Sequence, residues 1–263
     1  MRLATVRLGT GTRAARVEGD RLGLLPVPDV GTLLADQGWR ARAEATPEDW
    51  LDLVSADLAP LVPHPSKVLC VGLNYASHIL EMGRELPAYP TLFAKFASSL
   101  MGARDDLVLA AQSDQVDWEV ELGVVIGAPV RNADEDEARR AIAGYTVVND
   151  VSMRDWQWRT PQWLQGKAFE GCTPVGPFLV TGDEVGDAVD LEVSCEVDDQ
   201  VMQRSRTSDL VFGPAAVVAY ISQFTTLEPG DLIATGTPGG VGAARTPPVF
   251  LAPGQVLVTR VEG

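Results

Sequence analysis

Short runs of β-branched and other apolar residues, separated by glycine and proline, dominate the chain from about residue 66 onward and restrict it to a strand-rich fold. Clear strands are expected at residues 67–72, 119–126 and 145–150. Helical spacing is rarer; residues 134–143 have it, with acidic residues in the first turn and arginines near the end. No internal repeat is present. The sequence therefore predicts an α+β protein that is mainly β.

The first 62 residues mix short strand-like and helical pieces. Residues 5–8 and 13–18 are expected to pair as a hairpin across a Gly-Thr-Gly turn. A helix is expected at residues 47–54, because Thr46 can serve as N-cap and Pro47 suits the first helical position.

Three prolines in residues 60–65 then interrupt any regular pattern, because proline lacks the backbone donor that helices and sheets need. We place a boundary there. The expected organisation is a small N-terminal α+β domain at residues 1–62 and a catalytic domain at residues 63–263.

Charge and residue usage exclude several classes of protein. The 263-residue chain has a formal net charge of −15, which repels phosphate backbones and anionic lipid, so neither nucleic acid nor membrane is an expected partner. No signal-peptide-like or membrane-spanning apolar run is present, and the three cysteines are widely spaced, so a cytoplasmic location is expected. With only two histidines, a nitrogen-rich metal site is disfavoured, and any metal should be held by oxygen.

Three carboxylates are the candidates for that oxygen site. Glu119 and Glu121 lie two residues apart in an expected strand, so both point to one face, while the apolar neighbours suggest that the strand is covered. An edge strand with both glutamates facing water is the alternative. Asp150 at the end of a second apolar strand favours the buried site, and three carboxylates suit Mg²⁺ or Mn²⁺.

Five segments, in this order, resemble the fumarylacetoacetate hydrolase family from about residue 66 to the C-terminus. They are VGLNYASHILE (71–81), WEVELGVVIG (118–127), NDVSMRDWQ (149–157), GKAFE (166–170) with PVGP (174–177), and LEPGDLIATGTPGGVG (227–242). The resemblance implies the family's C-terminal-type fold of rolled, mixed β-sheets. The larger family members have a fourth carboxylate ligand upstream, for which this chain has no equivalent. The chain is therefore most similar to the shorter subgroup of acylpyruvate hydrolases and 2-hydroxyhepta-2,4-diene-1,7-dioate isomerases.

The resemblance also implies roles for individual residues. The matching positions are Glu119, Glu121 and Asp150 for the metal ligands; His78, Glu81 and Lys167 for catalysis; and Arg154, Gln157 and Thr237 for substrate binding. In these roles His78, oriented by Glu81, would activate water, and Lys167 would stabilise substrate oxygens.

The expected function is a metal-dependent hydrolase that cleaves a carbon–carbon bond in an acylpyruvate-type 2-oxo acid. The same site chemistry also fits a 2-oxo diacid decarboxylase or a dienol-diacid isomerase. A non-catalytic family member that only binds its ligand is the alternative from a different class. The resemblance further implies a homodimer and a small-molecule 2-oxo acid as the only other partner.

Two other patterns carry less information. Gly166-Lys167-Ala168 lacks the flanking residues of a phosphate loop, and no helix is expected after the glycine-rich residues 236–242, so dinucleotide binding is disfavoured. Trp156, Trp158 and Trp163 are compatible with a substrate wall, but core packing is the commoner use of tryptophan.

Overall fold

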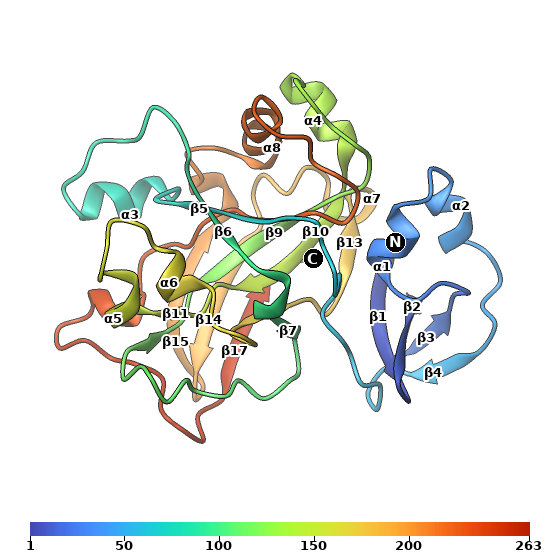
Figure 1. The fold of residues 1–263 in the computed structure, drawn as a ribbon, viewed down its shortest axis with the longest axis horizontal. Coiled ribbons are helices and arrows are strands. Elements are labelled where there is room, and N and C mark those ends of the chain that lie inside the picture. Colours follow the sequence, from blue (N-terminus) through green and yellow to red (C-terminus); the bar gives the residue numbers. More distant parts are fainter.

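The computed structural model describes all residues, 1–263, and is built around one large mixed sheet with two smaller sheets beside it (Figure 1). The 12 strands of the large sheet are β1 (Arg2–Leu8), β2 (Gly11–Glu18), β3 (Arg21–Leu24), β4 (Trp50–Asp52), β5 (Val68–Gly72), β6 (Thr91–Lys95), β7 (Leu100–Gly102), β9 (Val120–Ile126), β10 (Ile142–Asn149), β12 (Thr173–Val175), β13 (Leu179–Thr181) and β16 (Leu232–Ala234). A second sheet contains β14 (Glu192–Val197), β15 (Gln200–Arg206) and β17 (Leu257–Val261), and a third contains β8 (Val116–Asp117) and β11 (Ser152–Met153).

The helices are few and short. They are α1 (Val30–Leu34), α2 (Trp39–Ala43), α3 (Ala76–Glu81), α4 (Glu135–Ala141), α5 (Arg154–Gln157), α6 (Leu164–Lys167), α7 (Gly182–Val185) and α8 (Pro214–Ser222), with 3-10 turns η1 (Ala97–Ser99), η2 (Thr207–Asp209) and η3 (Gly242–Ala244). None of them has the length and apolar character that a membrane crossing requires. The expected α+β class, mainly β with a mixed sheet, is confirmed.

β9 lies in the middle of the large sheet and is covered on both faces. It pairs antiparallel with β10 and with β16, and all seven of its residues are buried. Val125 packs into one apolar cluster, whereas Leu122, Val124 and Ile126 pack into another on the opposite face. Glu121 shares the face of Val125, so one face of this strand changes from apolar core to carboxylate.

Several neighbouring elements agree with the sequence predictions. The expected strands at 67–72 and 145–150 correspond to β5 and to the end of β10. The expected helix at 134–143 is α4, which begins with a capping box in which Asp134 and Glu137 satisfy each other's backbone donors. α4 ends two residues early, because Ile142 already pairs with Ile126 in the sheet.

The N-terminal strands extend the large sheet on one side (blue in Figure 1). β1 and β2 form the expected hairpin, and β1 also pairs antiparallel with β13 through Leu3 and Leu179. One apolar cluster contains both Leu33 of α1 and Val125 of β9. The division into residues 1–62 and 63–263 stays a prediction.

The helix expected at residues 47–54 is wrong. Trp50–Asp52 is strand β4, which pairs antiparallel with β3, and the Leu24 backbone N–H already donates to the Asp49 carbonyl. The guanidinium of Arg21 lies 4.8 Å from the centroid of the Trp50 ring. Helix-start signals at Thr46 and Pro47 give only local preferences, and pairing with a neighbouring strand overrides them.

Candidate active site

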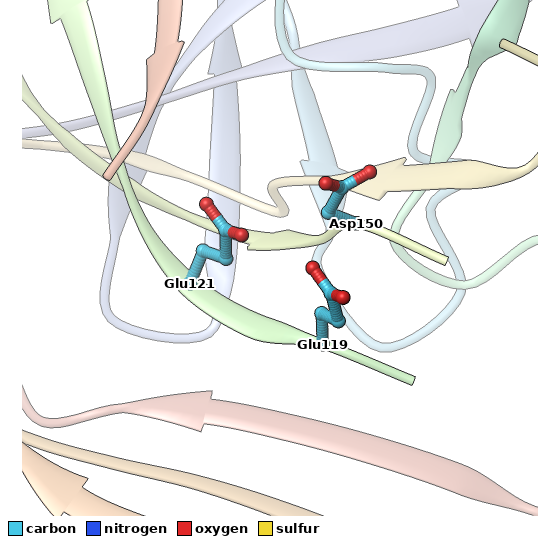
Figure 2. Close-up of side chains that lie close together, drawn as sticks. All are labelled: Glu119, Glu121 and Asp150. Carbon is cyan, nitrogen blue, oxygen red and sulfur yellow. The ribbon is translucent and has the colours of Figure 1, made fainter. Parts of the chain in front are cut away.

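Three carboxylates meet where β9 begins and β10 ends (Figure 2). Val148 is opposite Glu121 in the antiparallel register, and the Asp150 backbone N–H donates to the Glu119 carbonyl at 2.9 Å. This register brings oxygen atoms of Glu119, Glu121 and Asp150 within 4.8 Å of one another. Their exposed fractions are 7%, 1% and 0%. The water-facing alternative for the two glutamates is therefore wrong.

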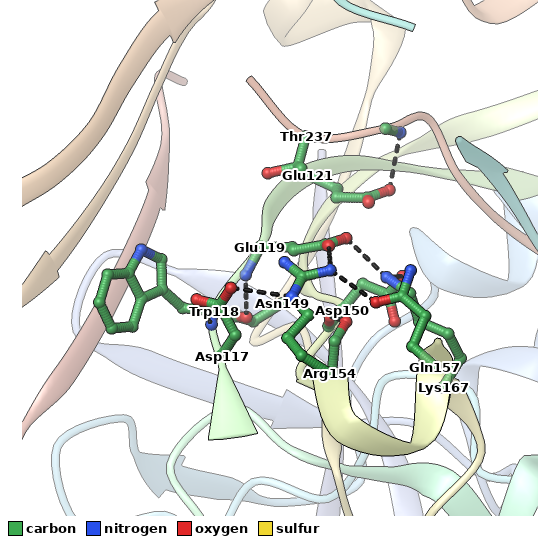
Figure 3. Close-up of polar contacts among 12 residues, drawn as sticks. Asp117, Trp118, Glu119, Glu121, Asn149, Asp150, Arg154, Gln157, Lys167 and Thr237 are labelled. Carbon is green, nitrogen blue, oxygen red and sulfur yellow. Dashed lines mark hydrogen bonds and ion pairs between the residues drawn. The ribbon is translucent and has the colours of Figure 1, made fainter. Parts of the chain in front are cut away.

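Two lysines compensate Asp150. Lys167 donates from Nζ to Asp150 Oδ2 at 2.8 Å and to Glu119 Oε2 at 2.7 Å, as Figure 3 shows. Lys95 donates from Nζ to the other oxygen, Oδ1, at 2.6 Å. Burial raises the pKa of the Asp150 carboxyl, but the charges of Lys167 and Lys95 outweigh burial and lower it. Desolvation lowers the pKa of each lysine, but attraction to neighbouring negative charges, that of Asp150 first, outweighs desolvation and raises the pKa.

Glu121 has no cationic partner. Its Oε2 accepts a hydrogen bond from the Gly236 backbone N–H at 2.7 Å, and no other donor is bound to it. Burial, and then the charges of Asp150 and Glu119, raise the pKa of Glu121 well above its ordinary value. A divalent cation among the three carboxylates would remove this penalty, and an all-oxygen ligand set suits Mg²⁺ or Mn²⁺. The residues therefore fit the metal that the sequence predicts.

A cavity of about 420 Å³ adjoins the carboxylates. Seven of the nine predicted site residues line it: Glu119, Glu121, His78, Lys167, Arg154, Gln157 and Thr237. Asp150 lies behind them, fully buried, and Glu81 lies outside the lining on an exposed part of α3. The positions that family resemblance assigned from five separate segments are thus brought together in space.

His78 and Glu81 lie on α3, three residues apart, on the side facing the glycine-rich loop. A Cβ built on Gly239 would lie 3.3 Å from His78 Nδ1 and 3.3 Å from Glu81 Oε2, so both side chains lie against the same glycine. Burial lowers the pKa of His78, although Glu81 and Glu119 act in the opposite direction. A neutral imidazole beside a carboxylate can accept a proton.

Arg154 and Gln157 lie on α5 and are both buried. Arg154 Nη1 donates to Gln157 Oε1 at 2.8 Å and forms an ion pair with Glu119 Oε1 at 2.6 Å. Desolvation lowers the pKa of Arg154, but the charges of Glu119 and then Asp117 outweigh it and raise the value. This cation lies in the wall of the cavity, beside a candidate metal ligand.

Thr237 lies in the loop that follows β16. Its Oγ1 accepts a hydrogen bond from Gln203 Nε2 at 2.8 Å, and Gln203 Oε1 accepts one from the Val120 backbone N–H at 2.9 Å. Gln203 therefore links this loop to the strand that carries the two glutamates.

Sequence reasoning missed several residues at this site. Lys95 and Asp117 are charged residues that end β6 and β8, and Asp117 continues the two-residue spacing of Glu119 and Glu121. That spacing was an available signal for Asp117. The sequence contains no such signal for Gln203, because its strand belongs to another sheet.

Two of the three tryptophans considered in the sequence, Trp158 and Trp163, do line the cavity. Gly72 makes room for one of them, because a Cβ there would come within 2.3 Å of the Trp163 ring. Trp156 instead packs edge-on against Phe169.

In this protein a mixed sheet holds three buried carboxylates beneath a small cavity. This combination of fold and site defines a class of proteins. The family model described as fumarylacetoacetate (FAA) hydrolase C-terminal matches residues 67–263. The chain belongs to the fumarylacetoacetate hydrolase family.

Relatives and solved structures agree with this assignment. The human mitochondrial protein named oxaloacetate tautomerase FAHD2A is 48% identical over 207 residues, which cover 78% of this chain and 66% of that protein. This chain thus spans less than two thirds of the length of that relative. The 2-hydroxyhepta-2,4-diene-1,7-dioate isomerase from Mycobacterium marinum is 32% identical with a TM-score of 0.82, covering 100% and 94% of the two chains. The fumarylacetoacetate hydrolase from Exiguobacterium antarcticum is 30% identical with a TM-score of 0.85, covering 100% and 96%.

Proposed function

We propose that this protein is a divalent-metal-dependent enzyme that interconverts the keto and enol forms of a small 2-oxo dicarboxylate such as oxaloacetate. The observation that carries the proposal is the set of three buried carboxylates, one of them without a cationic partner, at the floor of a cavity lined by Arg154 and Lys167. Relatives whose names specify oxaloacetate tautomerase and dienedioate isomerase support proton transfer as the reaction class.

The charge balance of the site favours an anionic ligand. Four carboxylates, of Asp117, Glu119, Glu121 and Asp150, face three cations, of Lys95, Arg154 and Lys167. One divalent ion changes the excess of one negative charge into an excess of one positive charge. Arg84, which lines the cavity, and Glu81, which lies against Gly239, cancel each other in this count. The remaining positive charge attracts an anionic ligand.

The residues of the site have distinct roles in this reaction. A Mg²⁺ or Mn²⁺ ion held by Glu119, Glu121 and Asp150 would supply Lewis-acid stabilisation of the enolate. His78 takes the proton from the carbon between the carbonyl and the second carboxylate, and the carbonyl oxygen gains a proton from water to give the enol. In the reverse direction the oxygen loses its proton to water and His78 returns one to the carbon. Lys167 donates to the oxygen that becomes negative, and Arg154 binds the carboxylate beside it. Trp158 and Trp163 line the cavity beside these groups.

Hydrolysis of a carbon–carbon bond in an acylpyruvate is the second candidate. The contact of both His78 and Glu81 with Gly239 favours it, because a carboxylate that orients the imidazole suits activation of water. Both reactions place negative charge on the same enolate oxygen, so they share Lys167 and the metal ligands.

A substrate panel separates the candidates. Purified protein with Mg²⁺ would be given oxaloacetate, acylpyruvates and fumarylpyruvate, and enol–keto exchange, carbon–carbon cleavage and release of CO₂ would be followed separately. The proposal requires that exchange of oxaloacetate is the fastest reaction. Faster cleavage of an acylpyruvate would favour the hydrolase, and no turnover of any compound would favour a non-catalytic binding protein.

The homodimer and the cytoplasmic location remain predictions. Sedimentation at micromolar protein concentration tests the first, and a monomer alone would contradict it.

A further inference from the structure

Asp117 joins three separate segments around the cavity. It ends β8, is fully buried, and lies two residues before Glu119. Its Oδ1 accepts from the backbone N–H groups of Gly242 at 2.7 Å and Trp118 at 2.9 Å. Its Oδ2 accepts from Arg154 Nε at 2.8 Å and from the Ala243 backbone N–H at 3.0 Å. Figure 3 shows the aspartate beside the guanidinium. A single carboxylate thus ties the glycine-rich loop and α5 to the strand of the metal ligands.

The guanidinium of Arg154 is held on two sides and is free on the third. Nε is bound by Asp117, and Nη1 is bound by Gln157 and Glu119. Nη2 is buried and has no hydrogen-bond partner, although Arg154 lines the cavity. A buried donor without a partner is unfavourable, and more so when it is charged, so an acceptor from a ligand would stabilise this nitrogen.

Asp117 is prevented from supplying that acceptor. A carboxylate commonly binds the Nε and Nη2 of an arginine with one oxygen each. Here Oδ1 is already occupied by two backbone donors. The contact with Gly242 is tight, because a Cβ there would lie 2.8 Å from Asp117 Oδ1 and 1.9 Å from the Val249 carbonyl oxygen. Asp117 therefore binds Arg154 through one oxygen, and Nη2 is left without a partner.

We infer that Asp117 is a positioning residue, which fixes the Arg154 guanidinium so that Nη2 binds a carboxylate oxygen of the substrate. The same carboxylate binds both residues 242–243 and this arginine. The loop that carries Thr237 and Gly239 is therefore fixed in position relative to the bound substrate. This role rests on the proposed function and belongs to a residue two positions before the metal ligand Glu119.

A cycle of variants tests the inference. Asp117→Asn, Arg154→Gln and the double variant would be titrated with oxalate, in the Mg²⁺-loaded protein, by calorimetry. Asp155→Asn is the matched control, because Asp155 lies on the same helix as Arg154 but accepts its hydrogen bond from Ser113. We expect Asp117→Asn to weaken oxalate binding at least tenfold, with the double variant no weaker than Arg154→Gln alone. The Mg²⁺ affinity of Asp117→Asn should stay within twofold, because none of the hydrogen bonds of Asp117 goes to a metal ligand. Losses that add up in the double variant, or an Asp117→Asn affinity equal to that of the control, would overturn the inference.

Nuclear magnetic resonance of the wild-type protein gives a test that does not depend on a variant folding. Arg154 Nε–H should exchange slowly with water before any ligand is added, and its signal should change little when oxalate binds. The Nη2 signals should shift. If oxalate leaves the Nη2 signals unchanged while it binds, the inference is wrong. Oxalate binding as expected, with no turnover of any 2-oxo acid, would overturn the proposed function and leave the role of Asp117 intact.

Discussion

Lys95 donates a hydrogen bond from Nζ to Asp150 Oδ1 at 2.6 Å, and neither side chain has any exposed surface. Since Lys167 holds the other oxygen of Asp150, this candidate metal ligand is fixed from two sides. Removing one member of a buried ion pair leaves the other charge desolvated and uncompensated.

Lys95→Met should therefore destabilise the protein strongly. We expect a loss of about 3–5 kcal/mol in the free energy of unfolding, the usual consequence of breaking a buried pair. Urea unfolding at neutral pH measures it. Lys67→Met is the control: Lys67 pairs with Asp231 at 3.1 Å but is partly exposed, and Asp231 keeps backbone donors from Lys67 and Glu228. Its loss should be about 0–1 kcal/mol. Equal losses in the two variants would contradict the role of Lys95.

Glu121→Gln should separate metal binding from folding. The variant keeps the size of the side chain but removes the charge that has no cationic partner, so the metal-free protein should be at least as stable as the wild type. Mg²⁺ should raise the midpoint of thermal unfolding of the wild type, because a ligand at 100 times its Kd adds about 2.7 kcal/mol to the folded state. Differential scanning calorimetry of both proteins, with and without Mg²⁺, would show the difference. A rise of equal size in Glu121→Gln would mean that the ion binds elsewhere.

The pH dependence of kcat/KM should reflect His78. Burial lowers the pKa of His78 below the ordinary histidine value of about 6.5, with Glu81, Glu119 and Arg154 as the charged groups that also act on it. The base works when neutral, so activity should be retained as pH falls through 6.5 and should be lost only below that value. An acid limb at or above pH 6.5 would contradict this assignment.

His78→Ala should affect the possible reactions unequally. Acylpyruvate hydrolysis should fall ~10²–10⁴-fold, the usual contribution of a positioned base. Decarboxylation of oxaloacetate depends chiefly on stabilisation of the enolate, so it should fall less, and Mg²⁺ affinity should barely change. Near wild-type rates of all reactions would require a different base.

Much of the fold and most of the site follow from local sequence pattern. The two-residue spacing of Glu119 and Glu121 gave their common face, and the apolar runs gave the strands that bring Asp150 to them. Strand β4 was mistaken for a helix, because the pairing that overrides Thr46 and Pro47 comes from β3, more than 20 residues away in the sequence. Non-local contacts of this kind leave no local periodicity.

The same limit explains which site residues were missed. Gln203 reaches Thr237 and Val120 from the second sheet, and Lys95 reaches Asp150 across 55 residues. Neither contact leaves a pattern in the sequence around it. Trp158 and Trp163 look like core residues until the cavity beside Gly72 is known.

The segment around α3 should respond to ligand. His78 lies on it, and the residues that follow, 81–86, are exposed, with Gly83 at a φ of +68°. We expect residues 76–88 to exchange backbone hydrogens rapidly in the free protein and more slowly with Mg²⁺ and oxalate, because closing the cavity confines water. Hydrogen–deuterium exchange measures this; the capped helix α4 serves as an internal reference that should not change. Equal exchange in the two states would argue against a closing segment.

The most direct measurement follows enol–keto exchange of oxaloacetate by ultraviolet absorbance as metal-free protein is titrated with Mg²⁺, in the wild type and in Glu121→Gln. The account predicts no rate above the protein-free control, which contains the same Mg²⁺, before metal is added to the wild type. It then predicts a rise that saturates at one ion per chain, and a variant that needs at least ~10-fold more Mg²⁺, because a neutral amide loses most of the attraction between ion and ligand. Full exchange by the metal-free wild type, or identical titrations of the two proteins, would contradict it.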